Sequence, residues 1–131
     1  MASIKDIIQS ADWKKEKHVP AIEIQGGIKK GQPVKVVVSV GKEIAHPNTT
    51  EHHIGWIDLY FLPQGEKFAY QVGRVEFNSH GASTLGPNTS TVSTDPVAAF
   101  TFKTEKAGSL IAVSYCNIHG LWESSQEITV S

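Results

Sequence analysis

The chain has 131 residues, of which 40% are hydrophobic and 19% charged, and its formal net charge is -1. These values are typical of one soluble domain spanning 1–131, and they exclude the strongly basic surface of a nucleic-acid-binding protein. No apolar run is long enough to cross a bilayer, and the N-terminus lacks the pattern of a secretory signal. We therefore expect a cytoplasmic protein with neither a membrane nor a nucleic-acid partner.

The first predicted element is a short N-terminal helix that ends before Trp13. Ser3 followed three residues later by Asp6 resembles a capping box, which marks a helix start. Apolar residues then recur at helical spacing, namely Ile4, Ile7, Ile8 and Ala11.

Beyond this helix the pattern predicts β-structure. Valines alternate with other residues over 34–40, and the residues after Pro20 also form a predicted strand. Further segments follow at intervals of about ten residues, separated by Gly and Pro. They are Ile54–Leu62, Phe68–Phe77, Val97–Lys103, Leu110–Tyr115 and Glu127–Val130. Short strands at this spacing favour an all-β antiparallel sandwich, with residues 78–96 as a long surface loop.

Cys116 is the only cysteine, so no internal disulfide can form and another use of this residue is needed. His119 follows at a Cys-x-x-His spacing that lets a thiolate and an imidazole reach one metal ion. Taken alone this motif is a weak signal.

Further histidines stand next to the predicted strands. His46 follows the valine-rich strand, and Pro47 after it favours an extended chain. His52 and His53 are neighbours whose side chains point to opposite faces in an extended chain, so only one can share a metal with His46. His18, preceded by Glu16 and Lys17, comes just before a strand.

Each of these residues also has an ordinary structural interpretation. An isolated histidine such as His80 is usually hydrogen-bonded or solvated, and His53 fits the same description. A buried cysteine is often an inert small hydrophobe, and Glu16 with Lys17 resembles a solvated charge pair. Several histidine-bearing loops at strand ends, together with the sole cysteine, nevertheless favour a shared metal site.

Three motifs in the sequence resemble superoxide reductase. They are EKHVP at 16–20, HPNTTEHHI at 46–54 and SYCNIHG at 114–120. The resemblance covers almost the whole chain, including GRVEF at 73–77 and LWE at 121–123. With a single cysteine the chain is similar to the small one-domain form, neelaredoxin, and lacks the four-cysteine iron domain of desulfoferrodoxin.

The resemblance implies a mononuclear iron site in an immunoglobulin-like β-sandwich that assembles as a homotetramer. It selects His52 over His53 and implies that the histidine after the cysteine binds through Nδ1 and the others through Nε2. Ala45 stands where relatives often have proline, which we expect to affect loop stiffness only. The implied ligands are His18, His46, His52 and His119 around the iron, with Cys116 axial.

The implied reaction is one-electron reduction of superoxide to hydrogen peroxide. Lys17 would attract superoxide and order the water that delivers protons. Glu16 would be an accessory ligand of the oxidised iron. Rubredoxin or a similar protein would return the electron.

Other classes of protein share parts of this pattern. A blue-copper electron carrier uses two histidines and a cysteine but typically adds an axial methionine, and the only methionine here is Met1. Structural zinc prefers four ligands, which would leave one donor unused. A superoxide dismutase remains open, as do the electron donor, the oligomeric state and the metal loaded in the cell.

Overall fold

The computed structural model describes all 131 residues and confirms the predicted all-β sandwich with a short N-terminal helix. The helix α1 spans Ile4–Ile7. Eight strands follow: β1 (Gln9–Ser10), β2 (Pro20–Gln25), β3 (Val34–Val40), β4 (Ile54–Pro63), β5 (Tyr70–Glu76), β6 (Val97–Phe102), β7 (Gly108–Cys116) and β8 (Gly120–Ile128). No helix has the length and apolar character needed to span a bilayer.

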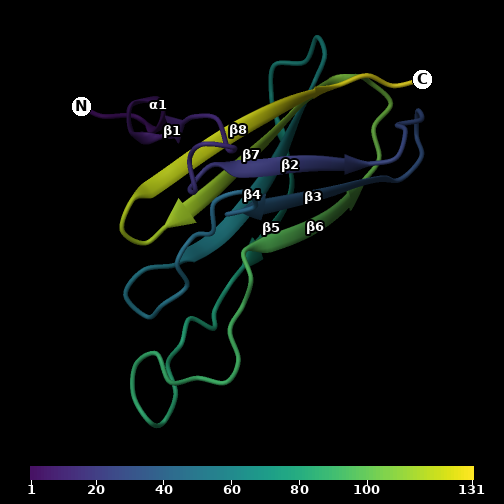
Figure 1. The fold of residues 1–131 in the computed structure, drawn as a ribbon. Coiled ribbons are helices and arrows are strands. Elements are labelled where there is room, and N and C mark those ends of the chain that lie inside the picture. Colours follow the sequence, from purple (N-terminus) through teal and green to yellow (C-terminus); the bar gives the residue numbers. More distant parts are fainter.

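The strands form two sheets that lie in two layers (Figure 1). One sheet has the order β1-β8-β7-β4-β5, and the other has the order β2-β3-β6. All neighbours are antiparallel except β1, which runs parallel to β8. This arrangement, with consecutive strands divided between two packed sheets, is that of an immunoglobulin-like sandwich.

The core lies between the two sheets and draws on both. Val36 and Val38 of β3 are fully buried, as are Ile57 and Leu59 of β4. They belong to one cluster of 15 buried residues. Because side chains alternate along a strand, the valine pattern at 34–40 places one continuous apolar row against the facing sheet. The predicted strand 34–40 therefore matches the observed one.

The N-terminal helix is shorter than predicted. Asp6 accepts hydrogen bonds from the backbone N–H and the hydroxyl of Ser3, as the capping pattern indicated. The chain then becomes extended at Ile8, and Gln9–Ser10 pair with β8. Ile4 is 62% exposed, so the helix has no core against which a longer apolar face could pack.

The last strand begins earlier than predicted, at Gly120 rather than Glu127. Residues 120–126 pair along their whole length with β7. The central part of β8 is polar, with Glu123 and Ser124 half-buried at the level where β1 or β2 lies alongside. Hydrogen bonding to neighbours, and not an apolar alternation, therefore defines this strand.

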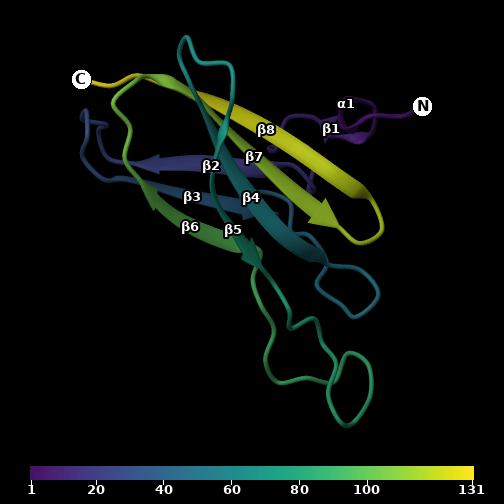
Figure 2. The ribbon, with the colours of Figure 1, turned by 180° about the vertical axis from the view of Figure 1, so that it is seen from behind.

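Four chain segments meet at one end of the sandwich. The segments are the chain entering β2, the β3–β4 loop, the β7–β8 turn and the long β5–β6 segment. In both views the β3–β4 loop and the β7–β8 turn lie on the same side, and the β5–β6 segment extends beyond them (Figures 1 and 2). The predicted site residues all belong to the first three segments.

Candidate metal centre

Four histidine rings form a closed ring at this end of the sandwich. The centroid of His18 is 4.9 Å from that of His46, which is 4.6 Å from that of His52. The circuit closes through His119, at 5.0 Å from His52 and 4.7 Å from His18. The diagonal between His18 and His52 is longer, at 6.2 Å. The four predicted histidines therefore surround a common centre.

Cys116 joins this ring of imidazoles. Its Sγ lies 3.6 Å from Nε2 of His46 and 3.7 Å from Nδ1 of His119. The backbone N–H of His119 also donates to Sγ at 3.4 Å. Donor atoms that lie within 4.8 Å of one another belong to His18, His52, Cys116 and His119. Because Cys116 is fully buried at the end of β7, the sulfur is fixed by the core of the protein.

The histidines present definite nitrogen atoms to this centre. Nδ1 of His18 contacts Glu16 at 2.6 Å, and Nδ1 of His46 contacts the carbonyl of Pro47 at 2.7 Å. Their Nε2 atoms are therefore the ones that face the cluster. His119 is the opposite case, since its Nδ1 lies 3.1 Å from Nε2 of His18. These orientations match the nitrogen atoms that the resemblance implies.

His52 provides the test of whether a metal fits. Its Nε2 is buried and has no hydrogen-bond partner, which is a costly state for a polar atom. Burial lowers the pKa of His52, and lowers the pKa of His46 to about 4, so both rings are neutral near pH 7. Neutral imidazoles with free lone pairs, together with one cysteine sulfur, are a donor set that suits iron. The residues present therefore fit a metal ion.

Glu16 lies outside the ring of donor atoms. Its Oε1 accepts the backbone N–H of His18 at 3.0 Å and contacts Nδ1 of the same ring at 2.6 Å. Partial burial works to raise the pKa of Glu16, but the hydrogen bonds from His18 outweigh it and lower that pKa. The carboxylate is thus ionised and orients His18, as carboxylates commonly orient metal-binding histidines.

Lys17 is half-buried next to the centre and forms no ion pair. Burial is the largest influence on the pKa of His46 and of His52, and the positive charge of Lys17 lowers both further. Lys17 is therefore close enough for its charge to act on the site.

His53 and His80 do not join the centre. Their rings stack with centroids 3.6 Å apart. Nδ1 of His53 contacts the carbonyl of Thr49, and both nitrogens of His80 contact oxygen atoms, those of Asn48 and Phe77. The structure therefore gives both residues the structural role expected from the sequence.

Two neighbours of the centre were not identified from the sequence as residues that support it. Trp122 stacks on His18 with a centroid distance of 5.0 Å, and its Nε1 donates to the carbonyl of His119. The side chain of Asn117 accepts the N–H of His53 and donates to the carbonyl of Glu51. Both residues lie within the motifs at 114–120 and 121–123, but these motifs do not indicate which atoms they contact.

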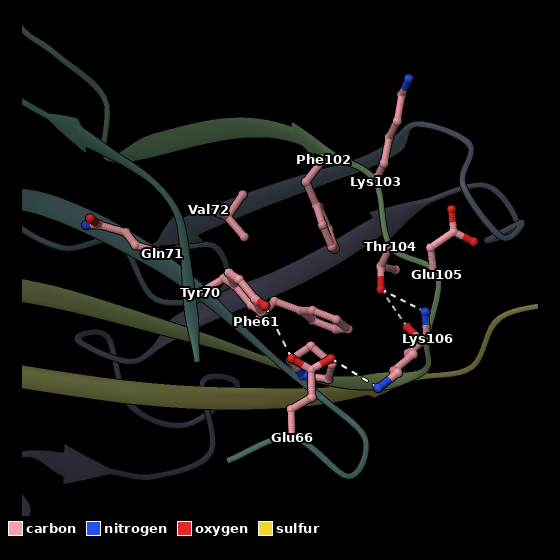
Figure 3. A pocket seen from close by; sticks show the side chains of 11 residues that line it. Phe61, Glu66, Tyr70, Gln71, Val72, Phe102, Lys103, Thr104, Glu105 and Lys106 are labelled. Carbon is pink, nitrogen blue, oxygen red and sulfur yellow. Dashed lines mark hydrogen bonds and ion pairs between the residues drawn. The ribbon is translucent and has the colours of Figure 1, made fainter. Parts of the chain in front are cut away.

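A large hollow in the surface lies away from this centre. It has a volume of about 470 Å³ and lies at the far end of β4, which runs the length of the sandwich. Phe61, Tyr70 and Phe102 line it, and its lysine Lys106 is already paired with Glu66 (Figure 3). Its other charged residues are Glu105, which lies 4.0 Å from Lys30, and Lys103, which points away from the hollow (Figure 3), so the hollow does not compete with the histidine cluster as the functional site.

Comparison with known proteins identifies the family. The desulfoferrodoxin family profile matches residues 10–125. The chain belongs to the desulfoferrodoxin family. Within this family, a superoxide reductase of Pyrococcus furiosus is 63% identical over 127 residues, covering 97% of this chain and 98% of that protein. A neelaredoxin of Megalodesulfovibrio gigas is 54% identical over 125 residues, covering 95% and 98%.

A solved structure of the desulfoferrodoxin family has the same fold. The superoxide reductase (neelaredoxin) from Archaeoglobus fulgidus in the reduced form superimposes with a TM-score of 0.89 at 63% sequence identity. The match covers 95% of this chain and 99% of that one. The family and the donor chemistry of the cluster both imply iron.

Proposed function

We propose that this chain is a superoxide reductase. One superoxide anion, one electron and two protons give one hydrogen peroxide, and no dioxygen is released. The observation that supports this most directly is the cluster of four imidazoles and one cysteine sulfur, with the Nε2 of His52 buried and unpaired. The high identity to proteins named superoxide reductase points to the same activity.

The residues that would hold the iron come from three segments of the chain. We assign His18, His46, His52 and His119 as imidazole ligands and Cys116 as the thiolate ligand. Iron bound there supplies a one-electron couple and a net positive charge that favours an anionic substrate. The buried position of Cys116 keeps its sulfur on the protein side of the cluster, and the more exposed His119 marks the solvent side.

Lys17 is assigned the attraction of superoxide and the ordering of proton-carrying water. It is half-buried and forms no ion pair, and its charge acts on His46 and His52. A positive charge at the mouth of a site raises association rates by about 10- to 1,000-fold. Lys17 can hold a water molecule through its ammonium group, which places a proton source beside the anion.

Glu16 is assigned two roles. In the structure its carboxylate contacts Nδ1 of His18, so it orients that ring for binding through Nε2. Its second role is that of an accessory ligand to the oxidised iron, which requires the carboxylate to leave His18. We therefore assign Glu16 a catalytic role, because its carboxylate would approach the iron. It is not required for holding the metal.

The remaining assignments concern the setting of the protein. We propose rubredoxin or a similar electron carrier as donor, and a homotetramer as the assembly. Exposed apolar residues at the N-terminus, including Ile4 and Ile7, are consistent with a partner surface. The 15-residue core shared by both sheets supports one iron-binding domain over 1–131. We also propose the cytoplasm as its location, since the sole cysteine forms no disulfide.

A blue-copper carrier fits the cluster less well. Such sites use two histidines, whereas four imidazole rings converge here. The only methionine, Met1, is fully exposed at the chain end and cannot serve as the axial ligand.

The test is the stoichiometry of the reaction. Iron-loaded protein supplied with an electron donor and superoxide should yield one hydrogen peroxide per superoxide, with no dioxygen. A dismutase would give one hydrogen peroxide per two superoxide anions and release dioxygen. The second result would contradict the proposal.

A further inference from the structure

We propose that Asn88 is a positioning residue that holds the β3–β4 loop in place around the metal centre. This loop, residues 41–53, carries His46 and His52, so the inference rests on the function proposed above. The middle of the loop does not face the centre. It contacts the long segment 77–96, which projects past this end of the sandwich (Figure 1).

The side chain of Asn88 makes hydrogen bonds with two consecutive residues of the loop. Its Oδ1 accepts the backbone N–H of Thr50 at 2.9 Å. Its Nδ2 donates to both carboxylate oxygens of Glu51, each at 3.1 Å. Thr50 and Glu51 immediately precede His52. One amide therefore fixes both the backbone and a side chain directly next to a metal donor.

The backbone of the segment is shaped to present this amide. Asn88 has a φ of 59° and is the only residue other than glycine with a positive φ. That conformation is unfavourable for most side chains, and asparagine tolerates it best. The carbonyl of Gly81 accepts the N–H groups of Thr89 and Ser90 at 2.8 and 3.0 Å. A side chain at Gly81 would meet Oδ1 of Asn88 at 3.0 Å, so this turn has room only for glycine.

A second attachment lies at the start of the same stretch. Nδ2 of Asn48 donates to the carbonyl of Thr94 at 2.7 Å, and its Oδ1 contacts Nδ1 of His80 at 2.7 Å. The stretch 48–51 is thus attached to the segment at both ends, between the two donors His46 and His52. We call this set of contacts, from Asn48 and from Asn88, the brace.

The brace has a consequence for metal retention. A ligand that is held in its binding position loses little conformational freedom when the metal binds, and it recaptures the metal quickly after a bond opens. Without the amide of Asn88, the loop gains freedom next to His52. We expect iron release to become about three- to tenfold faster, as loss of supporting hydrogen bonds implies.

The experiment measures how fast full-length, Fe(II)-loaded protein loses iron to an excess of chelator. Asn88→Ala should release iron faster than the wild type. Asn78→Ala is the matched control, because Asn78 lies in the same segment, is exposed and makes no hydrogen bond. Asn88→Gly removes the amide and also relieves the unfavourable positive φ at this position. It too should release iron faster than the wild type. Equal release from Asn88→Ala and Asn78→Ala would overturn the proposal.

A second pair of variants covers the case in which Asn88→Ala folds poorly. Asn88→Asp keeps the acceptor for Thr50 but places a carboxylate against Glu51, so it should release iron fastest. Adding Glu51→Gln supplies a new donor to that carboxylate and should restore slow release. Failure of this rescue would overturn the proposal, because a general loss of stability would not be repaired at Glu51.

The readout also separates the brace from the proposed function. Iron release does not require turnover. A protein that shows the expected release rates but fails to reduce superoxide would contradict the function and still support the brace. The thermal midpoint of the metal-free variants, measured in parallel, should stay within a few degrees of the wild type.

Discussion

The six histidines of this chain fall into two groups that lie side by side and differ in how their nitrogen atoms are used. In the ring formed by His18, His46, His52 and His119, the nitrogens that face the centre contact one another or the sulfur, or have no partner at all. In the stacked pair, both nitrogens of His80 contact oxygen atoms of the protein. Nδ1 of His53 contacts the carbonyl of Thr49, so three of the four nitrogens of the stacked pair have an oxygen partner, whereas Nε2 of His52 is buried without one.

This contrast is sharpest between His52 and His53, which are consecutive. The backbone bends before β4, where the carbonyl of His52 accepts the N–H of Thr49, and one ring points to the centre while the other joins the stacked pair with His80. The same residue type thus offers a buried, unpaired nitrogen at one position and stacks on a neighbouring ring at the next.

The largest effect is expected when the sulfur atom is removed, because only the group of residues around the centre contains one. Cys116→Ser should abolish reductase turnover, and it should abolish the long-wavelength sulfur-to-iron charge-transfer band of the oxidised protein. The physical reason is that a neutral hydroxyl donates far less electron density than a thiolate. The visible spectrum before and after oxidation measures this, and an unchanged colour would disprove the assignment of Cys116.

The paired variants His52→Ala and His53→Ala test the contrast directly. Losing a ligand should weaken iron binding by at least about 100-fold, because even supporting residues contribute 10- to 100-fold. His53→Ala should leave one iron per chain and lower the free energy of unfolding by about 1 kcal/mol, through a lost hydrogen bond. Iron titration and chemical denaturation give the two readouts. Equal loss of iron from both variants would disprove the proposed difference between His52 and His53.

Glu16 offers a smaller and more selective test. Glu16→Ala should weaken iron binding by about tenfold, because His18 loses the acceptor that orients it. Glu16→Gln should restore most of that affinity, since an amide oxygen still accepts the bond from Nδ1. At saturating iron, superoxide reduction should stay largely intact in both variants.

The same two variants, Glu16→Ala and Glu16→Gln, distinguish the accessory-ligand role of Glu16 from its orienting role. Both variants lack the carboxylate, so both should change the spectrum of the oxidised iron. An oxidised spectrum that matches the wild type would remove the accessory role. Identical iron affinities for the alanine and glutamine variants would remove the orienting role.

The smallest expected effect concerns charge near the ring. Lys17→Ala should lower the second-order rate constant with superoxide by about tenfold and flatten its dependence on salt. Lys103→Ala makes the same change in net charge beside the cavity at the opposite end, where Lys103 points away from the hollow (Figure 3). It should leave the rate unchanged. Equal effects of both variants would mean that only the total charge matters.

The sequence predicted those parts of the structure that depend on local pattern. The alternating valines of 34–40 define β3 to the residue, and the sole cysteine led directly to the centre. The strand β1 was missed because two residues carry no periodicity, and only their pairing with β8 makes them a strand. Contacts between loops, such as that of Asn88 with Glu51, likewise depend on tertiary structure, so no spacing of residues in the sequence predicts them.

The choice between His52 and His53 shows the same limit. Alternation of side chains along the chain predicts that one of the two neighbours faces the centre. It does not predict which one, because this depends on the backbone register at the start of β4. For Glu16, sequence and family resemblance suggested a place beside the iron. The observed contact with His18 depends on a side-chain orientation that no motif encodes.

The separation of His18 and His119 along the chain has a consequence for how the protein is made. Their ring nitrogens lie 3.1 Å apart although 101 positions separate them in sequence. Translation delivers His18 early, and it delivers Cys116 and His119 only with the last two strands. With the ligand set proposed above, the nascent chain would therefore lack a complete metal site until its C-terminal hairpin has left the ribosome. Apolar packing between the two sheets would then have to organise the polypeptide before the site could bind iron.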